Sequence, residues 1–487
     1  MTWPLRAAVA CLAVATAAAI LSFRPIYEPD LWWHLAHGRE DAAGRIVRTN
    51  VFSAGFADYR QQFTTWLFDT TLYAAWTGAG PAGVQLVQFG LLALTLGCLY
   101  AACRVRAPAW STAAVLMLGF FVLEPRAIPR PHLVSFAGMA AVTLAIERAA
   151  ARQSLGPLVW TIPGVALWSN FHVECLFGVA AIGMFAFGEM VKPAALGRPQ
   201  AVRAMLIAAV CGLATMANPY GWGLAAYLYE NMSVPQILAI AELRPPYLPD
   251  YRAFFAYAIA VGLALAIGWR SLRLSEALLA LTFGILGLKY LRLTPLLLLV
   301  TAPMLAARLA TLTSRGLDSR ALLITSACLA LTLSRIPLRL LATEIEAGTR
   351  AVAPPQFFSE PAIAFIERTG LEGPIFNSHN LGGYLAWALH PRVRIFQDSR
   401  LQAYPPEHFR RIIAASASQD EWNALVTGVD WAVISVPRAN QLSGHGRFPR
   451  AEWGTIYQDD AIEIVVRRKG KYGSVFGVAQ VLNHPER

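Results

Sequence analysis

Charged residues are scarce in this chain, and their scarcity excludes most soluble folds. Lys, Arg, Asp and Glu make up 15% of the 487 residues, hydrophobic residues make up 56%, and the mean hydropathy is +0.45. Soluble domains carry about 25% charged residues. The composition therefore predicts a polytopic α-helical membrane protein. The net charge of +11 does not indicate nucleic acid as a partner, because much of the excess lies in short loops between apolar segments.

Cysteine is also scarce, and its positions exclude two further classes. All six cysteines lie in apolar segments, none lies in the hydrophilic tail, and no Cys-x-x-Cys spacing occurs. The chain therefore has neither a disulfide framework nor a cysteine zinc site. The six are Cys11, Cys98, Cys103, Cys175, Cys211 and Cys328.

Long apolar segments are abundant, and we expect about eleven transmembrane helices because a crossing needs about 20 apolar residues. The first segment resembles a signal peptide, but its apolar core is longer than usual, so we expect a membrane anchor. The segments lie near residues 4–23, 82–103, 109–123, 132–147, 157–169, 172–191, 203–217, 253–269, 275–290, 293–311 and 320–336.

Basic residues gather in one set of turns, which we therefore expect to be cytoplasmic. The opposite side then carries a long first loop at residues 24–81, several polar turns, and everything after about residue 340. We expect two domains, a transmembrane domain at 1–345 and a hydrophilic domain at 346–487. The basic turns carry Arg104, Arg106, Arg148, Arg152, Lys192, Arg198, Arg203, Arg270, Arg273, Arg308, Arg315 and Arg320.

The first outer loop holds an acidic pair directly after the first apolar segment. Residues 27–34 read Tyr-Glu-Pro-Asp-Leu-Trp-Trp-His, so Glu28 and Asp30 are separated by one proline. Tryptophan is expected at a membrane interface, but carboxylates there are costly and indicate a functional site. The spacing also predicts a short helix at 30–38 and an interfacial helix at 63–76 that ends at glycines.

The tail reads as a small α/β domain with a largely parallel sheet. Strands are predicted at 373–377, 393–398, 431–436, 455–457 and 461–467, and helices near 382–389, 405–416 and 419–427. In parallel sheets ligands bind beyond the carboxyl ends of the strands. Asn377, His379, Asp398 and Arg400 are expected at that edge, where they either hold an acceptor or, for Asp398 and Arg400, form a local ion pair.

Taken together, the Glu-x-Asp motif in the first outer loop, the interfacial helix, about a dozen membrane helices and the carboxy-terminal domain resemble the GT-C superfamily of membrane glycosyltransferases. This superfamily includes oligosaccharyltransferases, protein mannosyltransferases and the aminoarabinose transferases of lipid A. Pro-Asp-Leu-Trp-Trp-His in the loop and the Asn…Gly-Gly-Tyr…Asp-Ser-Arg pattern in the tail are similar to an uncharacterised bacterial group.

The resemblance implies an inverting glycosyltransferase of the bacterial inner membrane with a periplasmic tail. The donor would be a sugar linked to polyprenyl phosphate, and the acceptor a glycan, a lipid or a protein, with membrane lipids around the helices. The first-loop acid would be a general base or a ligand of a divalent metal, a role that falls on Asp30 with Glu28 as its partner. His34 is a candidate for substrate binding beside them.

A lipid phosphate also requires cations on the outer face. Arg126, Arg130 and His132 lie in a proline-rich turn, and Lys289 and Arg292 flank another outer turn. Arginine grips phosphate with two parallel hydrogen bonds. The alternative is that these residues are interfacial anchors against lipid headgroups.

A third set of polar residues lies between two apolar segments, at Asn170, His172 and Glu174. Asn170 and His172 are candidates for substrate binding. His172 and Glu174 could also join Asp30 and Glu28 around Mg²⁺ or Mn²⁺, although a polar turn without metal would show the same residues.

Two other function classes stay open. One is a transporter or flippase of a lipid-linked sugar. Two observations argue against it, because the sequence has no internal repeat and no charged residue near the middle of a long apolar segment. The other is a non-catalytic membrane scaffold that uses the tail to recruit a partner.

Overall fold

The computed structural model describes residues 3–224, 226, 229, 241–313, 318–333, 358–436 and 446–476, except for residues 27, 45, 62 and 63. These form two compact units. The helical unit comprises Met1–Arg24, Ala79–Ala226 and Ala239–Thr349, and the mixed unit comprises Pro25–Gly78, Tyr227–Leu238 and Arg350–Arg487. The first outer loop is predicted to belong to the transmembrane domain. In the structure it lies almost wholly in the same unit as the tail.

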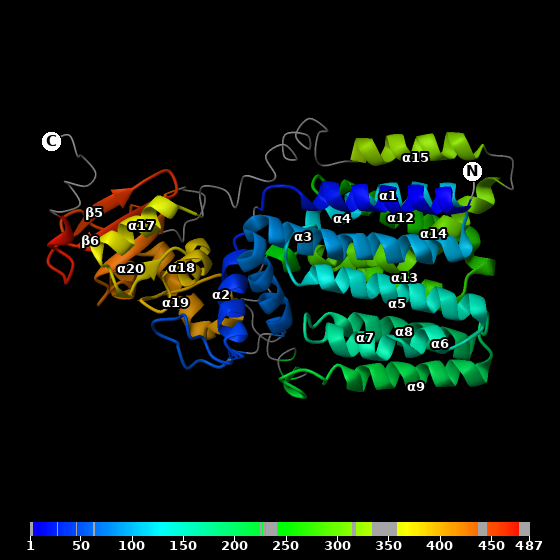
Figure 1. Ribbon diagram of the computed structural model, residues 1–487, viewed down its shortest axis with the longest axis horizontal. Coiled ribbons are helices and arrows are strands. Elements are labelled where there is room, and N and C mark those ends of the chain that lie inside the picture. Colours follow the sequence, from blue (N-terminus) through cyan, green and yellow to red (C-terminus); the bar gives the residue numbers. More distant parts are fainter. Residues whose placement is uncertain are drawn as a thin grey trace. The chain divides into compact units, whose positions relative to one another are not determined.

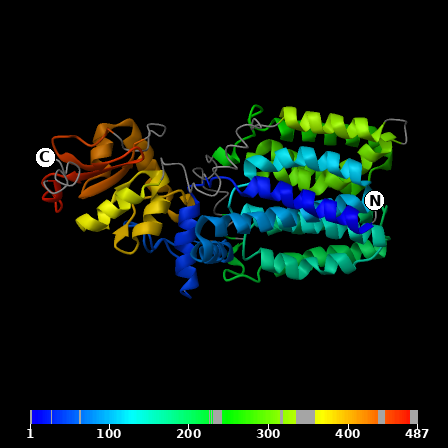
Figure 2. The same cartoon turned by 45° about the horizontal axis from the view of Figure 1, so that its top comes forward.

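The helices of the helical unit run side by side in both views of the ribbon (Figures 1 and 2). Every predicted apolar segment overlaps a helix. The helices are α1 (Trp3–Ser22), the second part of α3 (Trp66–Arg106), α4 (Ala109–Leu123), α5 (His132–Arg152), α6 (Gly156–Val159), α7 (Thr161–Trp168), α8 (Cys175–Val191), α9 (Arg198–Ala214), α12 (Arg252–Gly268), α13 (Leu274–Lys289), α14 (Thr294–Thr313) and α15 (Ser319–Leu333).

By length and composition, four helices among the described residues could cross a membrane on their own: Trp66–Arg106, His132–Arg152, Arg252–Ser271 and Leu291–Leu312. Shorter apolar helices lie at Ala8–Ser22, Gly156–Trp168 and Cys175–Val191. The chain is therefore rich in membrane-type helices, and the number of about eleven spans stays a prediction.

Helix α3 consists of two helices joined at a sharp break. Ala79 and Gly80 leave the helical conformation, and Gly80 has a φ of +57°, which favours glycine. The first part, Trp66 to Gly78, matches the predicted helix at 63–76 with its glycine stop, except that Phe63 lies outside the described residues. Its fully buried face carries Phe68, Asp69 and Leu72. Trp66, Leu67, Thr70 and Tyr73, which lie on one stripe at helical spacing, are half-buried, so contact of this helix with the membrane stays a prediction.

The mixed unit contains α2 (Leu31–Ala42), which confirms the predicted loop helix, and an α/β fold. Strand β1 (Gly373–Pro374) pairs with β3 (Val393–Arg394) in a two-stranded parallel sheet. The main sheet has the order β2-β4-β6-β5. Its strands are β2 (Phe376–Asn377), β4 (Trp431–Ser435), β5 (Trp453–Gln458) and β6 (Ile462–Arg467), and its helices are α17 (Glu360–Thr369), α18 (Gly382–Leu389), α19 (Pro406–Ala417) and α20 (Gln419–Leu425).

The prediction of a largely parallel sheet was wrong. Only β2 and β4 are parallel in the main sheet, whereas β4 with β6 and β5 with β6 are antiparallel. The reason lies in the connection, because the short turn at Asp459 can join only antiparallel neighbours. The predicted edge at Asn377 survives, since β2 ends there beside β4.

Strand β4 is buried on both faces, which explains its continuous apolar sequence. Trp431 and Val433 pack with α17 and α18 in one core, and Ala432 and Ile434 pack with α19 and α20 in a second.

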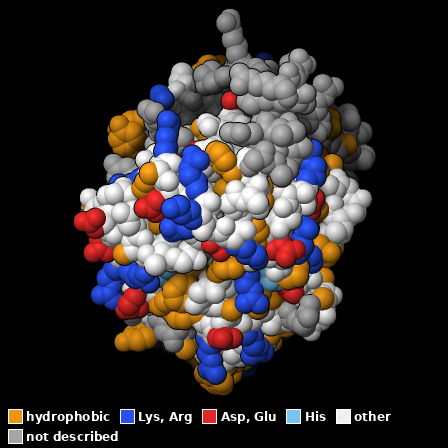
Figure 3. Space-filling view, turned by 90° about the vertical axis from the view of Figure 1, so that its left-hand side faces the viewer, with side chains coloured by type: hydrophobic (Ala, Val, Ile, Leu, Met, Phe, Trp, Pro, Cys, Tyr) orange, Lys and Arg blue, Asp and Glu red, His pale blue; other side chains and the backbone are white. Residues whose placement is uncertain are grey.

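The surface seen in Figure 3 intersperses acidic and basic side chains with small apolar groups, as a water-facing surface does.

Candidate functional site

The turn before α2 separates the roles of the two predicted carboxylates. Asp30 is the N-cap residue of α2, and its backbone N–H donates to Glu28 Oε1 at 3.1 Å. Glu28 is buried at 3% exposure, whereas Asp30 is half-buried. Glu28 therefore closes the turn. Asp30 is the more accessible acid, and the amino end of a helix stabilises negative charge there.

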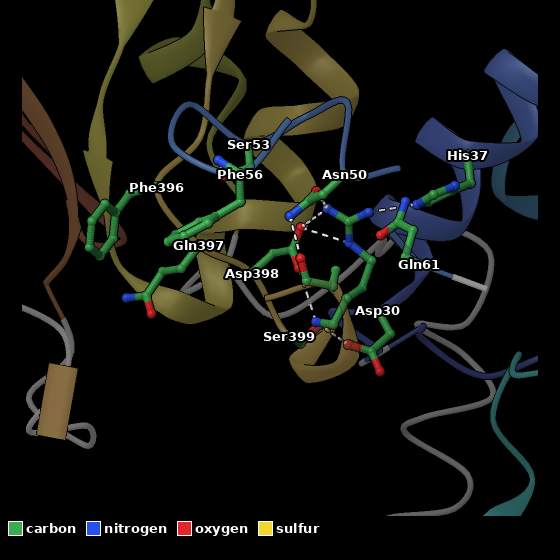
Figure 4. A network of polar contacts seen from close by, with 12 residues as sticks. Asp30, His37, Asn50, Ser53, Phe56, Gln61, Phe396, Gln397, Asp398 and Ser399 are labelled. Atoms are coloured by element: carbon green, nitrogen blue, oxygen red, sulfur yellow. Dashed lines mark hydrogen bonds and ion pairs between the residues drawn. The ribbon is translucent and has the colours of Figure 1, made fainter. Parts of the chain in front are cut away.

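The carboxylate of Asp30 is positioned by a residue from the tail. Ser399 Oγ donates to Asp30 Oδ1 at 2.5 Å, and Figure 4 shows the two side chains meeting beside Asp398. His379 lies close enough to Asp30 and Asp398 for their charges to affect it. Burial lowers the pKa of His379, although the charges of Asp398 and Asp30 raise it. His379 is thus a neutral imidazole near the candidate base.

Two glycines at the start of α18 allow close packing, Gly382 against Gln397 and Asp398 of the tail and Gly383 against the turn before α2. A Cβ on Gly382 would lie 2.0 Å from the carbonyl oxygen of Gln397, and a Cβ on Gly383 would lie 3.2 Å from the backbone nitrogen of Trp33. Gly383 of the Gly-Gly-Tyr motif therefore serves close packing between the tail and the first outer loop. Further along the loop, Ser53 pairs with Ile395 in a parallel bridge.

Arg400 forms the buried centre of the mixed unit, and its side chain is 0% exposed. Its Nε donates to Asp398 Oδ2 at 2.8 Å, its Nη2 also contacts Asp398, and Nη2 donates to Asn50 Oδ1 at 3.0 Å. Its Nη1 lies 2.6 Å from His37 Nε2. Burial and the charge of Arg400 lower the pKa of His37, so neutral His37 accepts this hydrogen bond.

Asn377 is likewise buried at 0% exposure and is used in structural hydrogen bonds. Its Nδ2 donates to the Gln397 carbonyl at 2.8 Å, and its Oδ1 accepts from the backbone N–H of Phe396 at 2.8 Å. The structure therefore brings Asn377, His379, Asp398 and Arg400 together as predicted. Of these four, only His379 is partly exposed, and contact with an acceptor stays a prediction for all of them.

His34 pairs with a residue that the sequence did not single out. Its Nδ1 lies 2.6 Å from Asp69 Oδ1, and Thr65 Oγ1 donates to Asp69 Oδ2 at 3.1 Å. Burial raises the pKa of Asp69, and His34 opposes that shift. Because His34 is 1% exposed, it links α2 to α3, and its predicted role in substrate binding is not tested. Neither Asp69, His37 nor Asn50 carries a local sequence signal.

A second polar cluster lies in the helical unit, in the proline-rich turn before α5. Arg126 Nη1 and Arg130 Nη1 both contact Glu242 Oε1, at 2.9 Å and 2.6 Å. Glu242 belongs to the short helix η2 (Ala241–Leu243). Although burial raises its pKa, the charges of Arg130 and Arg126 lower it to about 2, so Glu242 is ionised. No local sequence pattern indicates Glu242.

The remaining outer residues extend this cluster. His132 Nε2 lies 2.7 Å from the Arg126 carbonyl oxygen, and Glu174 pairs with Arg292 at 3.0 Å and with His172 Nδ1 at 3.5 Å. These predicted residues therefore lie together in one unit.

Two other predicted residues have different surroundings. Asn170 Nδ2 donates to the carbonyls of Ala166 and Ala217, which is a structural role. Lys289 is exposed, and its ammonium lies 5.1 Å from the ring centre of Tyr290.

Two of the residues named for a divalent metal make other contacts within their own units. Glu28 accepts from the Asp30 backbone N–H, and Glu174 forms an ion pair with Arg292. In the parts of the chain that the structure describes, no three His, Cys, Asp or Glu side chains gather as metal ligands. Binding of Mg²⁺ or Mn²⁺ by these residues stays a prediction.

No protein-family model and no curated protein matches the chain. Solved structures do match. The archaeal oligosaccharyltransferase AglB from Archaeoglobus fulgidus, in complex with an inhibitory peptide and a dolichol-phosphate, is similar with a TM-score of 0.63 and 11% identity, over 89% of this chain and 70% of AglB.

ArnT from Cupriavidus metallidurans matches in two states. The structure bound to undecaprenyl phosphate has a TM-score of 0.52 at 13% identity, over 94% of this chain and 97% of ArnT. The apo structure has a TM-score of 0.52 at 14% identity, over 95% and 98%. The chain therefore shares the fold of AglB and ArnT, which agrees with the expected GT-C fold.

Proposed function

We propose that this protein is a membrane glycosyltransferase that moves a sugar from a polyprenyl-phosphate donor to a nucleophilic acceptor. The observation that carries the proposal is Asp30, a half-buried carboxylate at a helix amino end whose Oδ1 is held by Ser399. The GT-C fold supports it, because two solved structures with that fold contain dolichol-phosphate or undecaprenyl phosphate.

Asp30 is the proposed general base. It takes the proton from an acceptor hydroxyl or amine, the acceptor atom then attacks the anomeric carbon of the sugar, and the bond from that carbon to the phosphate oxygen breaks. The electron pair leaves with the polyprenyl phosphate. Attack from the side opposite the leaving group inverts the anomeric configuration. Ser399 restricts the carboxylate to one orientation, which general base catalysis requires.

Arg126 and Arg130 are the proposed ligands of the donor phosphate. Two guanidinium groups that already converge on one carboxylate oxygen can also stabilise the charge of a departing phosphate. From the distribution of basic residues we expect these side chains on the extracytoplasmic face, which in a bacterium is the periplasmic face of the inner membrane. The acceptor would be a glycan, a lipid or a protein on that face.

The test is sugar transfer by the purified full-length chain in proteoliposomes. Because the donor sugar is unknown, a panel of undecaprenyl-phosphate sugars is offered together with a membrane extract as acceptor, and the release of undecaprenyl phosphate is measured by mass spectrometry. Asp30→Asn keeps an oxygen for Ser399 but removes the base, so the rate should fall by about 10²-fold or more.

Asp58→Asn is the matched control, because Asp58 is an exposed carboxylate of the same loop. It should leave the rate unchanged. Full activity of Asp30→Asn beside an active wild type would refute the role of Asp30, and release of no lipid phosphate from any donor would refute the transferase itself.

A further inference from the structure

We infer that Glu242 competes with the lipid phosphate for Arg126 and Arg130, so that the donor binds by displacing this carboxylate. The inference rests on the proposed function, because it specifies how the phosphate ligands of that reaction become available. Glu242 would then set the affinity of the protein for the donor.

The geometry of the two arginines is that of an oxyanion site. Both Nη1 atoms contact the same atom, Glu242 Oε1, so two donors converge on one point. Arg126 is buried, with 6% of its side chain exposed, and it lies in a turn stiffened by Pro125, Pro129 and Pro131. Arg126 is thus held in place, whereas the Glu242 side chain is 24% exposed and has room to move.

Glu242 is held mainly through its charge. It lies in a three-residue helix, and the neighbouring hydrogen bond fixes the backbone rather than the side chain, because the Arg244 carbonyl accepts from Leu291 N–H at 2.8 Å. A change of the Glu242 rotamer can therefore free both guanidinium groups without unfolding the loop.

A phosphate is the ligand class that can take this place. It has more than one non-bridging oxygen and can bind each arginine through two parallel hydrogen bonds. A carboxylate that both arginines contact through one oxygen cannot do so for both. A second anion beside ionised Glu242 would be repelled, because like charges that close disfavour each other. The two anions therefore exclude each other.

The opposite end of α5 provides the comparison. There Glu147 also lies between two arginines, Arg106 at 3.2 Å and Arg273 at 3.4 Å, but Arg106 has Glu276 as a further carboxylate partner. That group is a balanced network that ties helices together. Glu147 is therefore a matched control, with the same side chain and the same kind of partners at the other end of the helix.

The experiment measures binding of undecaprenyl phosphate to the full chain in nanodiscs of phosphatidylcholine, with undecaprenol as the uncharged control. Glu242→Gln and Glu242→Ala should each lower the dissociation constant about tenfold, because they remove the competing charge. Glu147→Gln should leave it unchanged. Arg130→Ala should raise it about tenfold or more, since a charge-assisted contact is lost.

Each outcome decides one question. Tighter binding by both Glu242 variants, specific for the phosphate, supports competition. Unchanged or weaker binding by them, while Arg130→Ala still weakens binding, would show that Glu242 only supports the arginines, and the proposed function would stand. A wild type that does not distinguish undecaprenyl phosphate from undecaprenol would overturn both the competition and the proposed phosphate site.

Discussion

Replacing Arg400 by alanine tests whether the polar cluster of the tail is structural. Its guanidinium contacts Asp398, Asn50 and His37, and its side chain and that of Asp398 are both 0% exposed. Removing one partner of a buried ion pair costs about 3–5 kcal/mol, because the other charge is left buried. In a unit of roughly 200 residues each kcal/mol lowers the melting temperature by about 2–4 °C, so we expect a loss of about 10 °C.

The measurement is the temperature at which the tail of the full-length chain becomes sensitive to protease. Arg392→Ala is the control, because Arg392 and Glu367 form an ion pair in the same unit at 2.9 Å with 48% and 50% of their side chains exposed. An exposed pair contributes about 0–1 kcal/mol. Equal melting of the two variants, together with a raised half-saturation concentration for acceptor in Arg400→Ala, would refute the structural interpretation and support acceptor binding.

Two further predictions concern the same unit and the same assay. Gly38→Ala should lower the melting temperature by several degrees, because its Cβ would lie 2.1 Å from the Asp69 carbonyl oxygen and overpacking costs about 1–3 kcal/mol, whereas Gly78→Ala, with no atom within 4 Å, should melt like wild type. For His37, burial and Arg400 lower the pKa below 6.5, so its stabilising contribution is complete above about pH 6.5 and decreases as the pH falls towards the folded-state pKa. His37→Gln should therefore reduce the loss of melting temperature between about pH 7.5 and pH 5.5, and an unchanged loss would contradict the reasoning.

The local features of the fold were predictable because they depend on local patterns. The helix after Asp30, the helix that ends at Gly78 and the α/β character of the tail all follow from spacing, caps and glycine stops. The direction of the strands was not predictable, because packing across the sheet decides which strands become neighbours. Asp459 and Asp460 lie between the last two predicted strands, and a connection this short joins antiparallel neighbours.

The candidate site was predictable in its residue types and less so in their environment. Asp398 and Arg400 were named, yet their burial depends on Asn50 and His37, which lie about 350 residues earlier in the chain. The same holds for Glu242, whose partner Arg126 is separated from it by 116 residues. Pairs formed only by the tertiary fold leave no trace in the spacing of a single sequence.

The position of Asp30 depends on contacts with the first outer loop and with the tail. Its helix α2 packs through Gly38 against α3 on one side, and Gly383 of α18 packs against its first turn on the other. Ser399 then holds the carboxylate itself. Because general base catalysis is sensitive to small displacements of the base, a change in the tail that loosens α18 should affect the rate without contacting the substrate. The tail would then act as a positioning element for the proposed base.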